Sequence, residues 1–484
     1  ENQPIGSFLE HSITGQFETN KPDELLGPFT NDTLSPKTMQ NVTGFEPRHD
    51  DYVKSSRMCG TCHTINLPIM DHEPVTAVGP STPLSMEQAT YLEWLNSRYQ
   101  NEFGPRTAQT RTCQDCHMQG GYTNTKKSID IPQIQDRIAI IEDETYPEAD
   151  HRLPDPEITV RKRETGFVRH ELLGLNAYLL TFFQQFNEIL GVRLPDYSTG
   201  SESDLQDAID NVVQKAGPET ATLEQPSATF ANGRIIARVK VVNWTGHRFP
   251  SGVGFRRAFL EVRAVITKDG KEGTIWGSGV TNQLGVILDG DRKPLKSEFF
   301  ETVTGPDGQT LQASQPHYQT ITRQDQVQIY EELIKNSEGK FTTSFIRRDE
   351  EFKDNRLLPI GWSRTGPSAS LPLEFLKDTF PKGNAESDPD YNDGSGSDTI
   401  SYEIPVPSGI DPASVTIKMR LIYQAIPPSY LNQRFTEVPN GPATQRLYYL
   451  ASNLKVEGTP ISGWKLPVAS ISIPVLRPAA IRSE

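Results

Sequence analysis

The chain has 484 residues, of which 35% are hydrophobic and 23% charged, enough for two or three globular domains and unlike a disordered chain. Its net charge of −14 argues against nucleic acid as a partner, because binding to a phosphate backbone requires a basic face. No apolar run is long enough for a membrane helix, so we expect no transmembrane segment.

Residues 1–125 contain scattered Pro and Gly and few periodic stretches. One helix is expected from about Met86 to Gln100, because Ser85 followed by Gln88 resembles a capping box. The first residues, Glu1 to Pro4, include no initiator Met and no signal pattern, so we expect a mature end from which a secretory signal has been removed.

The four cysteines of the chain all fall in two C-x-x-C-H motifs. Two thiols about one turn apart can each add to a vinyl group of one porphyrin, and the following His can then meet the iron. The pattern therefore predicts two covalently attached haem c groups with His63 and His117 as proximal iron ligands. The first motif comprises Cys59, Cys62 and His63, and the second comprises Cys113, Cys116 and His117.

Zinc binding and dithiol redox chemistry are the two other uses of such cysteines. Paired C-x-x-C units that bind zinc usually lie roughly 15–20 residues apart, whereas Cys62 and Cys113 are much further apart. A thioredoxin-like dithiol requires one motif in a βαβ context, and here there are two in polar surroundings. Haem is therefore the favoured interpretation, and zinc is the alternative.

Candidates for the sixth iron ligands come from the remaining histidines. His170 is expected early in an apolar helix, roughly Phe167 to Leu190, where its ring could point at an iron; the alternative is an ordinary buried His. His247 lies in a loop, 243–252, whose Gly and Pro residues predict a shaped turn between two strands. His49 is the first reserve, and His72 and His151 follow it.

A second helix is expected over Asp204 to Ala216, and after Gly217 the hydrophobic period changes from helical to alternating. Turn signals and alternating runs then predict an antiparallel β-sandwich. The expected fold is multidomain α+β: a mostly irregular and α-helical dihaem cytochrome c domain with long helices over residues 1–220, then the sandwich over 221–484. The expected hairpin turns lie at 232–233 and 268–271, and the expected strands at 235–242, 258–266, 327–334, 341–347 and 415–423.

An acidic loop at residues 388–398 alternates Asp and Asn around glycines. Such a loop can wrap oxygens around Ca²⁺, although it has no Glu to complete an EF-hand, and acidic loops are commonly just solvated. The candidate calcium ligands are Asp388, Asp390, Asn392 and Asp398.

The chain resembles bacterial multihaem cytochromes c related to the cytochrome c554 group. The resemblance runs from about His49 onward and is carried by residues 59–63, Glu93-Trp94, 113–118, 170–176, 245–252, Arg256-Arg257, 327–331 and 353–359. It implies bis-His haems, electron transfer and export beyond the cytoplasmic membrane, and it supports His170 and His247 as distal ligands. Relatives carry further haem motifs upstream, which leaves open the roles of His11 and His49.

We expect an exported, periplasmic or extracellular electron-transfer protein, rather than an enzyme, whose partners are redox proteins such as other multihaem cytochromes. One alternative is a haem enzyme with an open iron site, such as a reductase of small oxyanions or a peroxidase. Another is an accessory subunit of a larger multihaem complex or filament.

Overall fold

The computed structural model describes residues 4–12, 21–30, 36–71, 83–135, 138–142, 159–163, 166–193 and 205–477. The chain divides into two compact units: unit 1 is Glu1–Ile65 with Tyr99–Gly174, and unit 2 is Asn66–Arg98 with Leu175–Glu484. Helices and mainly antiparallel sheets together make the α+β class that was predicted. The expected domain boundary near residue 220 stays a prediction. Among the described residues, no helix is both long and apolar enough to cross a bilayer.

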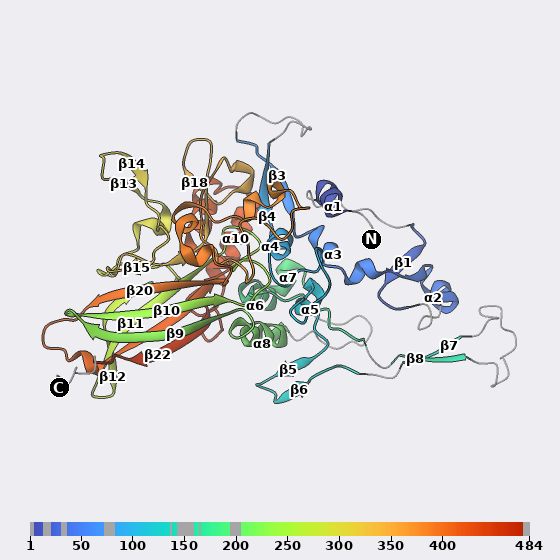
Figure 1. Cartoon of the computed structure of the whole chain (residues 1–484), viewed down its shortest axis with the longest axis horizontal. Helices are drawn as coiled ribbons and strands as arrows, with labels where there is room; N and C mark the ends of the chain where they lie inside the picture. Colours follow the sequence, from blue (N-terminus) through green and yellow to red (C-terminus); the bar gives the residue numbers. More distant parts are fainter. Residues whose placement is uncertain are drawn as a thin grey trace. The chain divides into compact units, whose positions relative to one another are not determined.

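Short elements make up unit 1 (Figure 1). β1 pairs in parallel with β2, while β5–β6 and β7–β8 are antiparallel pairs. Its helices are α1 (Ile5–Ser12), α2 (Pro36–Thr43), η2 (Asp51–Lys54), α3 (Ser56–Gly60) and α5 (Cys113–His117), and its strands are β1 (Glu24–Gly27), β2 (Glu46–His49), β5 (Tyr122–Asn124), β6 (Ile129–Ile131), β7 (Ile138–Glu142) and β8 (Thr159–Arg163).

The helix expected from Met86 to Gln100 is mostly wrong. Ser85 and Gln88, which resembled a capping box, lie in strand β4 (Leu84–Gln88), which pairs with β3 (Ile65–Pro68). Only α4 (Thr90–Leu95) is helical, and it ends where Asn96 exchanges hydrogen bonds with the Ser363 backbone, at 2.8 and 3.2 Å. Tertiary hydrogen bonds therefore replace the continuation of this helix.

The long helix expected from Phe167 to Leu190 is also wrong at its start. The backbone N–H groups of Arg169 and Leu172 donate to the carbonyls of Gln119 and His117, each at 3.0 Å, which holds this stretch in a non-helical conformation. Leu172 has φ +50°, outside the right-handed helical region. Helix α6 begins only at Ala177, after Asn176 caps it by accepting a hydrogen bond from the Leu179 N–H at 3.0 Å.

Unit 2 contains the longest helices of the described chain. The helix expected at 204–216 is confirmed as α8, and it packs against α6. Long helices were predicted before residue 220. Among the described residues there, only α8, with twelve residues, approaches such a length. The helices of unit 2 are α4, α6 (Ala177–Gln185), α7 (Asn187–Leu190), α8 (Leu205–Ala216), α9 (Pro428–Glu437) and α10 (Pro442–Asn453).

Two sheets form the body of unit 2 (Figure 1). The first has the order β15 (Thr320–Ile321), β20 (Ser397–Pro405), β10 (Arg234–Asn243), β9 (Ala221–Ala231). The second has the order β12 (Lys271–Ser278), β11 (Arg257–Lys268), β21 (Val415–Gln424), β22 (Leu466–Pro474), with β16 (Ile329–Tyr330) on β11. All pairs are antiparallel except β15–β20, so the predicted antiparallel sheets are confirmed.

The remaining described elements of unit 2 are short. β13 (Thr302–Thr304) pairs with β14 (Thr310–Gln312), and β17 (Glu332–Lys335) lies between β18 (Phe341–Thr342) and β19 (Glu350–Asp354). The 3₁₀ turns are η4 (Lys296–Phe299), η5 (Phe345–Arg347), η6 (Leu373–Phe375), η7 (Lys377–Thr379), η8 (Gly383–Ser387), η9 (Pro389–Tyr391) and η10 (Pro412–Ser414).

Alternating apolar side chains bury one face of each large sheet. The fully buried positions on this face are Ile235, Ala237, Val239 and Val241 in β10, Ile400, Tyr402 and Ile404 in β20, Ala258, Leu260, Val262 and Ala264 in β11, and Ile417, Met419 and Leu421 in β21. Trp276 of β12 meets Tyr402 of β20 edge to face, with ring centroids 6.2 Å apart, so the two buried faces share one core.

Both predicted hairpin turns are present. Asn232-Gly233 and Asp269-Gly270 have positive φ at both residues, as a two-residue hairpin of matching twist requires. The strands expected at 327–334 and 341–347 are interrupted. The first changes partners at Glu331, because β16 pairs with β11 whereas β17 pairs with β18 and β19. The second stops at Thr342 and continues into a 3₁₀ turn.

Candidate haem-binding site

The first C-x-x-C-H motif begins on α3 and ends in the turn after it. Ser55 caps the helix by accepting a hydrogen bond from the Arg57 N–H at 3.2 Å. The Arg57 guanidinium donates to one oxygen of Glu102 through Nε at 3.0 Å and Nη2 at 2.7 Å. Cys59 is half-buried, while Cys62 and His63 are exposed. The helix is thus anchored while the second cysteine and the histidine face outward.

The second motif forms α5 in full. Thr112 and Asp115 make a capping box, in which the Thr112 hydroxyl accepts from the Asp115 N–H at 3.2 Å and the Asp115 carboxylate accepts from the Thr112 N–H at 2.8 Å. Cys113 and His117 are half-buried, and Cys116 is exposed. The helical turn brings Cys113 and Cys116 to the spacing that addition to one porphyrin requires.

The two motifs are held against each other within unit 1. The Cys113 N–H donates to the Ser56 hydroxyl at 3.1 Å. The Gln114 amide donates to the carbonyls of Val53 and Ser55 at 3.1 and 2.9 Å, so the first turn of α5 is bonded to the first turn of α3. Neither contact was expected from the sequence, because both join residues far apart in the chain.

The thiols of Cys59 and Cys113 are close enough to shift each other's pKa. The interaction with Cys113 lowers the pKa of Cys59, although burial opposes the change. The interaction with Cys59, together with burial, raises the pKa of Cys113. The first cysteines of the two motifs are therefore neighbours.

His117 has the tautomer that an iron ligand requires. Its Nδ1 lies 3.0 Å from the carbonyl oxygen of Leu173, and because a carbonyl can only accept, Nδ1 carries the proton. The lone pair is then on Nε2. A hydrogen bond from the far nitrogen of a metal-bound His to a carbonyl typically fixes its orientation, so these residues fit a haem iron at Nε2.

His170 lies in the segment that is bonded to the second motif. Arg169 and Leu172, on either side of it, bind the backbone of Gln119 and His117, and its own side chain is exposed. The segment therefore runs beside the face of His117 that carries Nδ1. Nε2 of His117, the atom that would bind an iron, is on the other edge of the ring.

His247 lies in unit 2, in the loop between β10 and β11. Its Nδ1 is 2.8 Å from the Arg248 carbonyl oxygen, so this ring too has its proton on Nδ1 and its lone pair on Nε2. The His247 carbonyl accepts from the Asn243 amide at 2.8 Å and from the Thr245 hydroxyl at 2.7 Å. These bonds hold the shaped turn that the sequence predicted.

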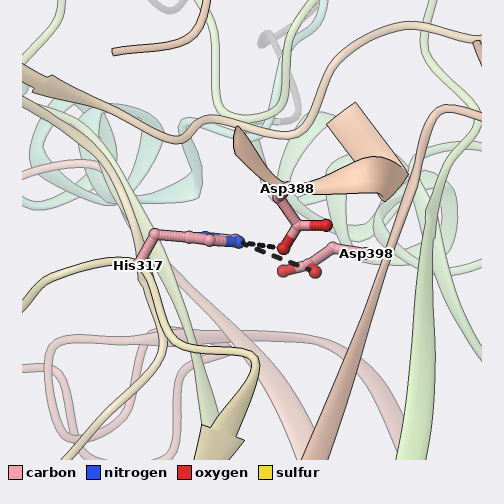
Figure 2. Close-up of side chains that lie close together, drawn as sticks. All are labelled: His317, Asp388 and Asp398. Carbon is pink, nitrogen blue, oxygen red and sulfur yellow. Dashed lines mark hydrogen bonds and ion pairs between the residues drawn. The ribbon is translucent and has the colours of Figure 1, made fainter. Parts of the chain in front are cut away.

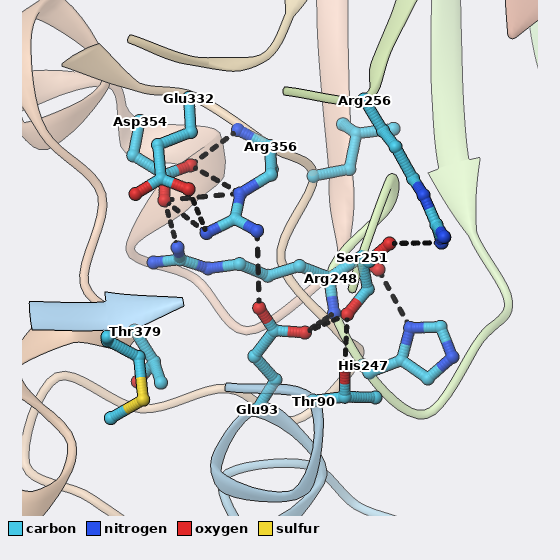
Figure 3. Close-up of polar contacts among 12 residues, drawn as sticks. Thr90, Glu93, His247, Arg248, Ser251, Arg256, Glu332, Asp354, Arg356 and Thr379 are labelled. Atoms are coloured by element: carbon cyan, nitrogen blue, oxygen red, sulfur yellow. Dashed lines mark hydrogen bonds and ion pairs between the residues drawn. The ribbon is translucent and has the colours of Figure 1, made fainter. Parts of the chain in front are cut away.

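Glu93 of α4 braces the same loop from inside unit 2 (Figure 3). Its side chain is fully buried, and one oxygen accepts from the Arg248 N–H at 3.2 Å and from the Ser251 hydroxyl at 2.6 Å. The Thr90 hydroxyl, one helical turn earlier, is 2.9 Å from that of Ser251. The sequence alone gives Glu93 no role, because its hydrogen-bond partners lie far away in the chain.

The buried charges next to this loop are paired. The Arg248 guanidinium forms an ion pair with Asp354. Asp354 also binds Arg356 at 2.6 Å, and Arg356 lies 3.6 Å from Glu93 (Figure 3). Burial would raise the pKa of Asp354, but the two guanidinium groups outweigh it and lower that pKa. The loop of His247 is therefore fixed by a buried ionic network.

Of the reserve histidines, His49 lies within the described residues and has an acidic neighbour. His49 lies at the end of β2, where its Nε2 is 3.3 Å from the Asp51 carboxylate. His72 and His151 lie outside the described residues, as does the side chain of His11.

The four candidate calcium ligands serve the protein's own hydrogen bonds. Asp388 accepts from the Asp390 N–H at 2.9 Å, and Asp390 accepts from the Thr399 N–H at 2.7 Å. Asn392 accepts from the Arg364 guanidinium at 3.1 Å, an unsuitable neighbour for a cation. These contacts give calcium no support, and it stays a prediction.

Asp388 and Asp398 instead meet His317 in a buried cluster (Figure 2). His317 Nε2 lies 2.9 Å from Asp388 Oδ2 and 3.9 Å from Asp398 Oδ1. Asp398 Oδ2 accepts from Gln328 and Tyr330, each at 2.9 Å, whereas Oδ1 has no hydrogen-bond partner among the described residues. Burial, chiefly, raises the pKa of Asp398 to about 6.

The hydrogen bonds around His317 do not fit a metal site. Its Nδ1 faces the amide nitrogens of Gln328 and Asn355 at 2.8 and 3.2 Å. Those amides cannot be reversed, because their oxygens accept from the backbone N–H groups of Tyr318 and Glu331 at 2.8 and 3.1 Å. Nδ1 is thus an acceptor, and Nε2 carries the proton given to Asp388. A ligand nitrogen requires the opposite tautomer.

No family model matches the chain, and no curated protein matches its sequence. Among solved structures, the chain is similar to a penta-heme cytochrome c552 from Thermochromatium tepidum, with 12% sequence identity and a TM-score of 0.39 over 93% of this chain and 68% of that one.

Proposed function

We propose that the chain is an exported dihaem c-type cytochrome that transfers electrons between redox partners through two bis-His haems. The observation that carries the proposal is the direct bonding of two C-x-x-C-H motifs through Ser56 and Gln114. Short separation between redox centres favours electron transfer, and these contacts keep the two attachment points together. Export is implied by the resemblance to multihaem cytochromes.

The proposed roles follow from the side chains. Cys59 and Cys62 would hold one haem, with His63 as its proximal ligand; the second motif would hold the other in the same way. Bound haem c supplies a one-electron iron couple. The Leu173 carbonyl keeps the proton on Nδ1 of His117 and thereby directs Nε2 toward the iron position.

One of the two distal candidates lies in the unit that carries both motifs. His170 lies beside the Nδ1 face of His117, so we assign it to the haem of the first motif. His247 is the other proposed distal ligand, and Glu93 and Asn243 hold its loop in place. Its ring already has the lone pair on Nε2.

A haem enzyme with one open iron site is the second candidate. The observation in its favour is the exposure of the His170 side chain, which leaves the first-motif iron dependent on an exposed ligand. Redox proteins, including other multihaem cytochromes, are the proposed partners in either case. As an accessory subunit, the chain would have a larger multihaem complex or filament as its partner.

The test combines intact mass with ligand binding. Chain produced in a host that attaches haem c should gain the mass of two haems, and the Cys113→Ser/Cys116→Ser variant the mass of one. After reduction, carbon monoxide should leave the visible spectrum of the wild-type protein unchanged, because both irons are six-coordinate. Absence of covalent haem would overturn the proposal, whereas immediate carbon monoxide binding would favour the enzyme.

A further inference from the structure

We propose that the outward face of the second sheet of unit 2 is a docking surface for an acidic protein partner, whose carboxylates bind a basic patch on this face. The basic patch consists of Arg263 on β11, Lys418 and Arg420 on β21, and Lys465 just before β22. The inference goes beyond the proposed function, because this sheet belongs to unit 2 whereas both C-x-x-C-H motifs lie in unit 1.

The register of the strands places the cations of the basic patch side by side. Arg263 lies directly opposite Lys418 in the pairing of β11 with β21, and Glu261 lies opposite Arg420 in the next row. Directly paired residues point to the same side of a sheet, with Cβ atoms about 5 Å apart. Met419, between Lys418 and Arg420, is fully buried in the shared core, so the basic patch faces outward.

Glu261 has more cations around it than one carboxylate neutralises. Its buried carboxylate accepts from Arg420 at 2.5 Å and from Lys465 at 2.9 Å. The Arg263 guanidinium lies 2.8 Å from the same carboxylate. Burial lowers the pKa of Lys465, and the two guanidinium groups act in the same direction, against Glu261. Among the described residues, three cations therefore share one negative charge.

Lys418 adds a fourth cation to the basic patch. It pairs with the exposed Glu272 at 2.5 Å and lies directly opposite Arg263. Two like charges in directly opposite positions of a sheet destabilise it. A carboxylate arriving between Lys418 and Arg263 would relieve this repulsion, so the arrangement favours binding of an anionic group.

One end of this outward face is already covered within unit 2. Phe259 and Ile422, which pair with each other, are fully buried in a cluster with Ile287, Leu295 and Ile329. The basic patch lies beyond this cluster, and its cations on β11 and β21 have side chains between 33% and 39% exposed. A partner therefore has access to the charged end of the sheet.

Small residues flank the basic patch. Ser470 and Ser472 of β22 pair with the two cations of β21, and both serines are exposed. On the opposite flank, Gly277 of β12 pairs with Arg263. A flat protein surface can therefore approach the cations without meeting large side chains.

The mixture of charges favours a protein partner over a uniform polyanion. The net charge of −14 repels a nucleic acid, an anionic polysaccharide or an anionic membrane, all of which have dense negative charge. Glu261 and Glu272, within or beside the basic patch, would oppose such a polyanion further. A folded protein can instead place carboxylates opposite the cations and neutral groups opposite the two glutamates.

The experiment measures binding of the full-length chain to immobilised poly-L-glutamate by surface plasmon resonance at low ionic strength. Ser470→Glu/Ser472→Glu places carboxylates beside the cations of the basic patch and removes none of them. The matched control is Thr399→Glu/Ser401→Glu, which places the same charges opposite the two cations of β10 on the outward face of the other sheet.

We expect the patch variant to bind poly-L-glutamate about tenfold more weakly than the wild type, and the control to stay within about twofold of it. Lys418→Gln, which leaves the ion pairs of Glu261 in place, should weaken binding about threefold. Added salt should weaken wild-type binding, because the charges of the basic patch are partly exposed.

No binding of the wild-type chain, or equal losses in the patch variant and the control, would overturn the proposal. Dextran sulfate is the comparison probe for a uniform polyanion. If the wild type binds it more tightly than poly-L-glutamate and the patch variant loses this binding, the partner is a polyanion and the assignment to an acidic protein is wrong.

Discussion

His117 donates a hydrogen bond from Nδ1 to the backbone carbonyl of Leu173, 3.0 Å away, across more than fifty residues of sequence. The carbonyl belongs to a stretch that is itself bonded to the second motif, because the Leu172 N–H donates to the His117 carbonyl at 3.0 Å. The histidine and the segment that orients it thus depend on each other.

The first prediction concerns this relationship. Leu172→Pro removes the N–H donor and forces φ to about −65°, whereas Leu172 has φ +50°. The Leu173 carbonyl should move away from His117, which makes the imidazole a weaker donor to iron and raises the reduction potential of the second haem. Spectroelectrochemical titration measures the shift. Leu172→Gly, which accepts positive φ and keeps the N–H, is the control and should leave both potentials unchanged.

The second prediction concerns Glu93. Glu93→Ala leaves the Arg248 N–H and the Ser251 hydroxyl without their acceptor and takes a negative charge from beside Arg356. We expect a loss of about 3 kcal/mol in the free energy of unfolding. Glu93→Gln keeps one acceptor and should lose about 1 kcal/mol. Urea denaturation measures both, with the exposed Glu219→Ala as control, and equal stability of all three variants would show that the loop needs no brace.

The third prediction is a pH dependence from Glu351. Burial raises its pKa to about 8, with contributions from several charged neighbours. Because the folded pKa lies above the unfolded value, this group stabilises the fold fully below the unfolded pKa of 4.5, and the stabilisation is lost as pH rises toward 8. The charged groups whose fields act on it are Arg348, Glu332, Asp354 and Arg248.

Glu351→Gln should therefore flatten the fall in unfolding free energy between those two pH values, a slope of at most about 1.4 kcal/mol per pH unit. Denaturation at a series of pH values compares the variant with the wild type. Parallel curves for the two proteins would mean that Glu351 is ionised throughout.

The fourth prediction separates a hydrogen-bonded cluster at His317 from a metal site. Asp398→Asn places an amide group where Oδ1 has no partner and removes one of two neighbouring carboxylates. We expect a gain of about 1 kcal/mol in the free energy of unfolding and no change in the unfolding midpoint when Ca²⁺, Zn²⁺ or a chelator is added. A midpoint that rises with either metal in the wild type, and not in the variant, would contradict this account.

Much of the fold could be predicted from local patterns. Helix α8 and strands β10, β11 and β21 have periodicities that their own residues establish, and Asn232-Gly233 requires no tertiary partner to make a turn. The errors arose where distant contacts decide the conformation. At Glu331 the chain changes from one partner strand to another. The stretch before Asn176 is non-helical because it is bonded to the second motif.

The candidate site also has parts that the sequence predicts and parts that it does not. Both motifs are visible in the sequence because their residues are adjacent, and a signal for the rigid loop of His247 was present in its Gly and Pro residues. The bond between Gln114 and Ser55, the carbonyl that orients His117 and the brace from Glu93 all join distant positions. One sequence cannot show such pairings, since no local period or composition reports them.

The most direct test of the account is electron paramagnetic resonance of the oxidised protein, made on wild type and on the single-haem Cys113→Ser/Cys116→Ser background. The account predicts only low-spin signals in the wild type. On the single-haem background, His170→Ala should convert the remaining iron to high spin, while His247→Ala and the control His49→Ala should leave it low spin. A high-spin iron already present in the wild type would contradict the proposed bis-His arrangement. A single-haem form that loses its ligand with His247→Ala would contradict the assignment of His170 to the haem of the first motif.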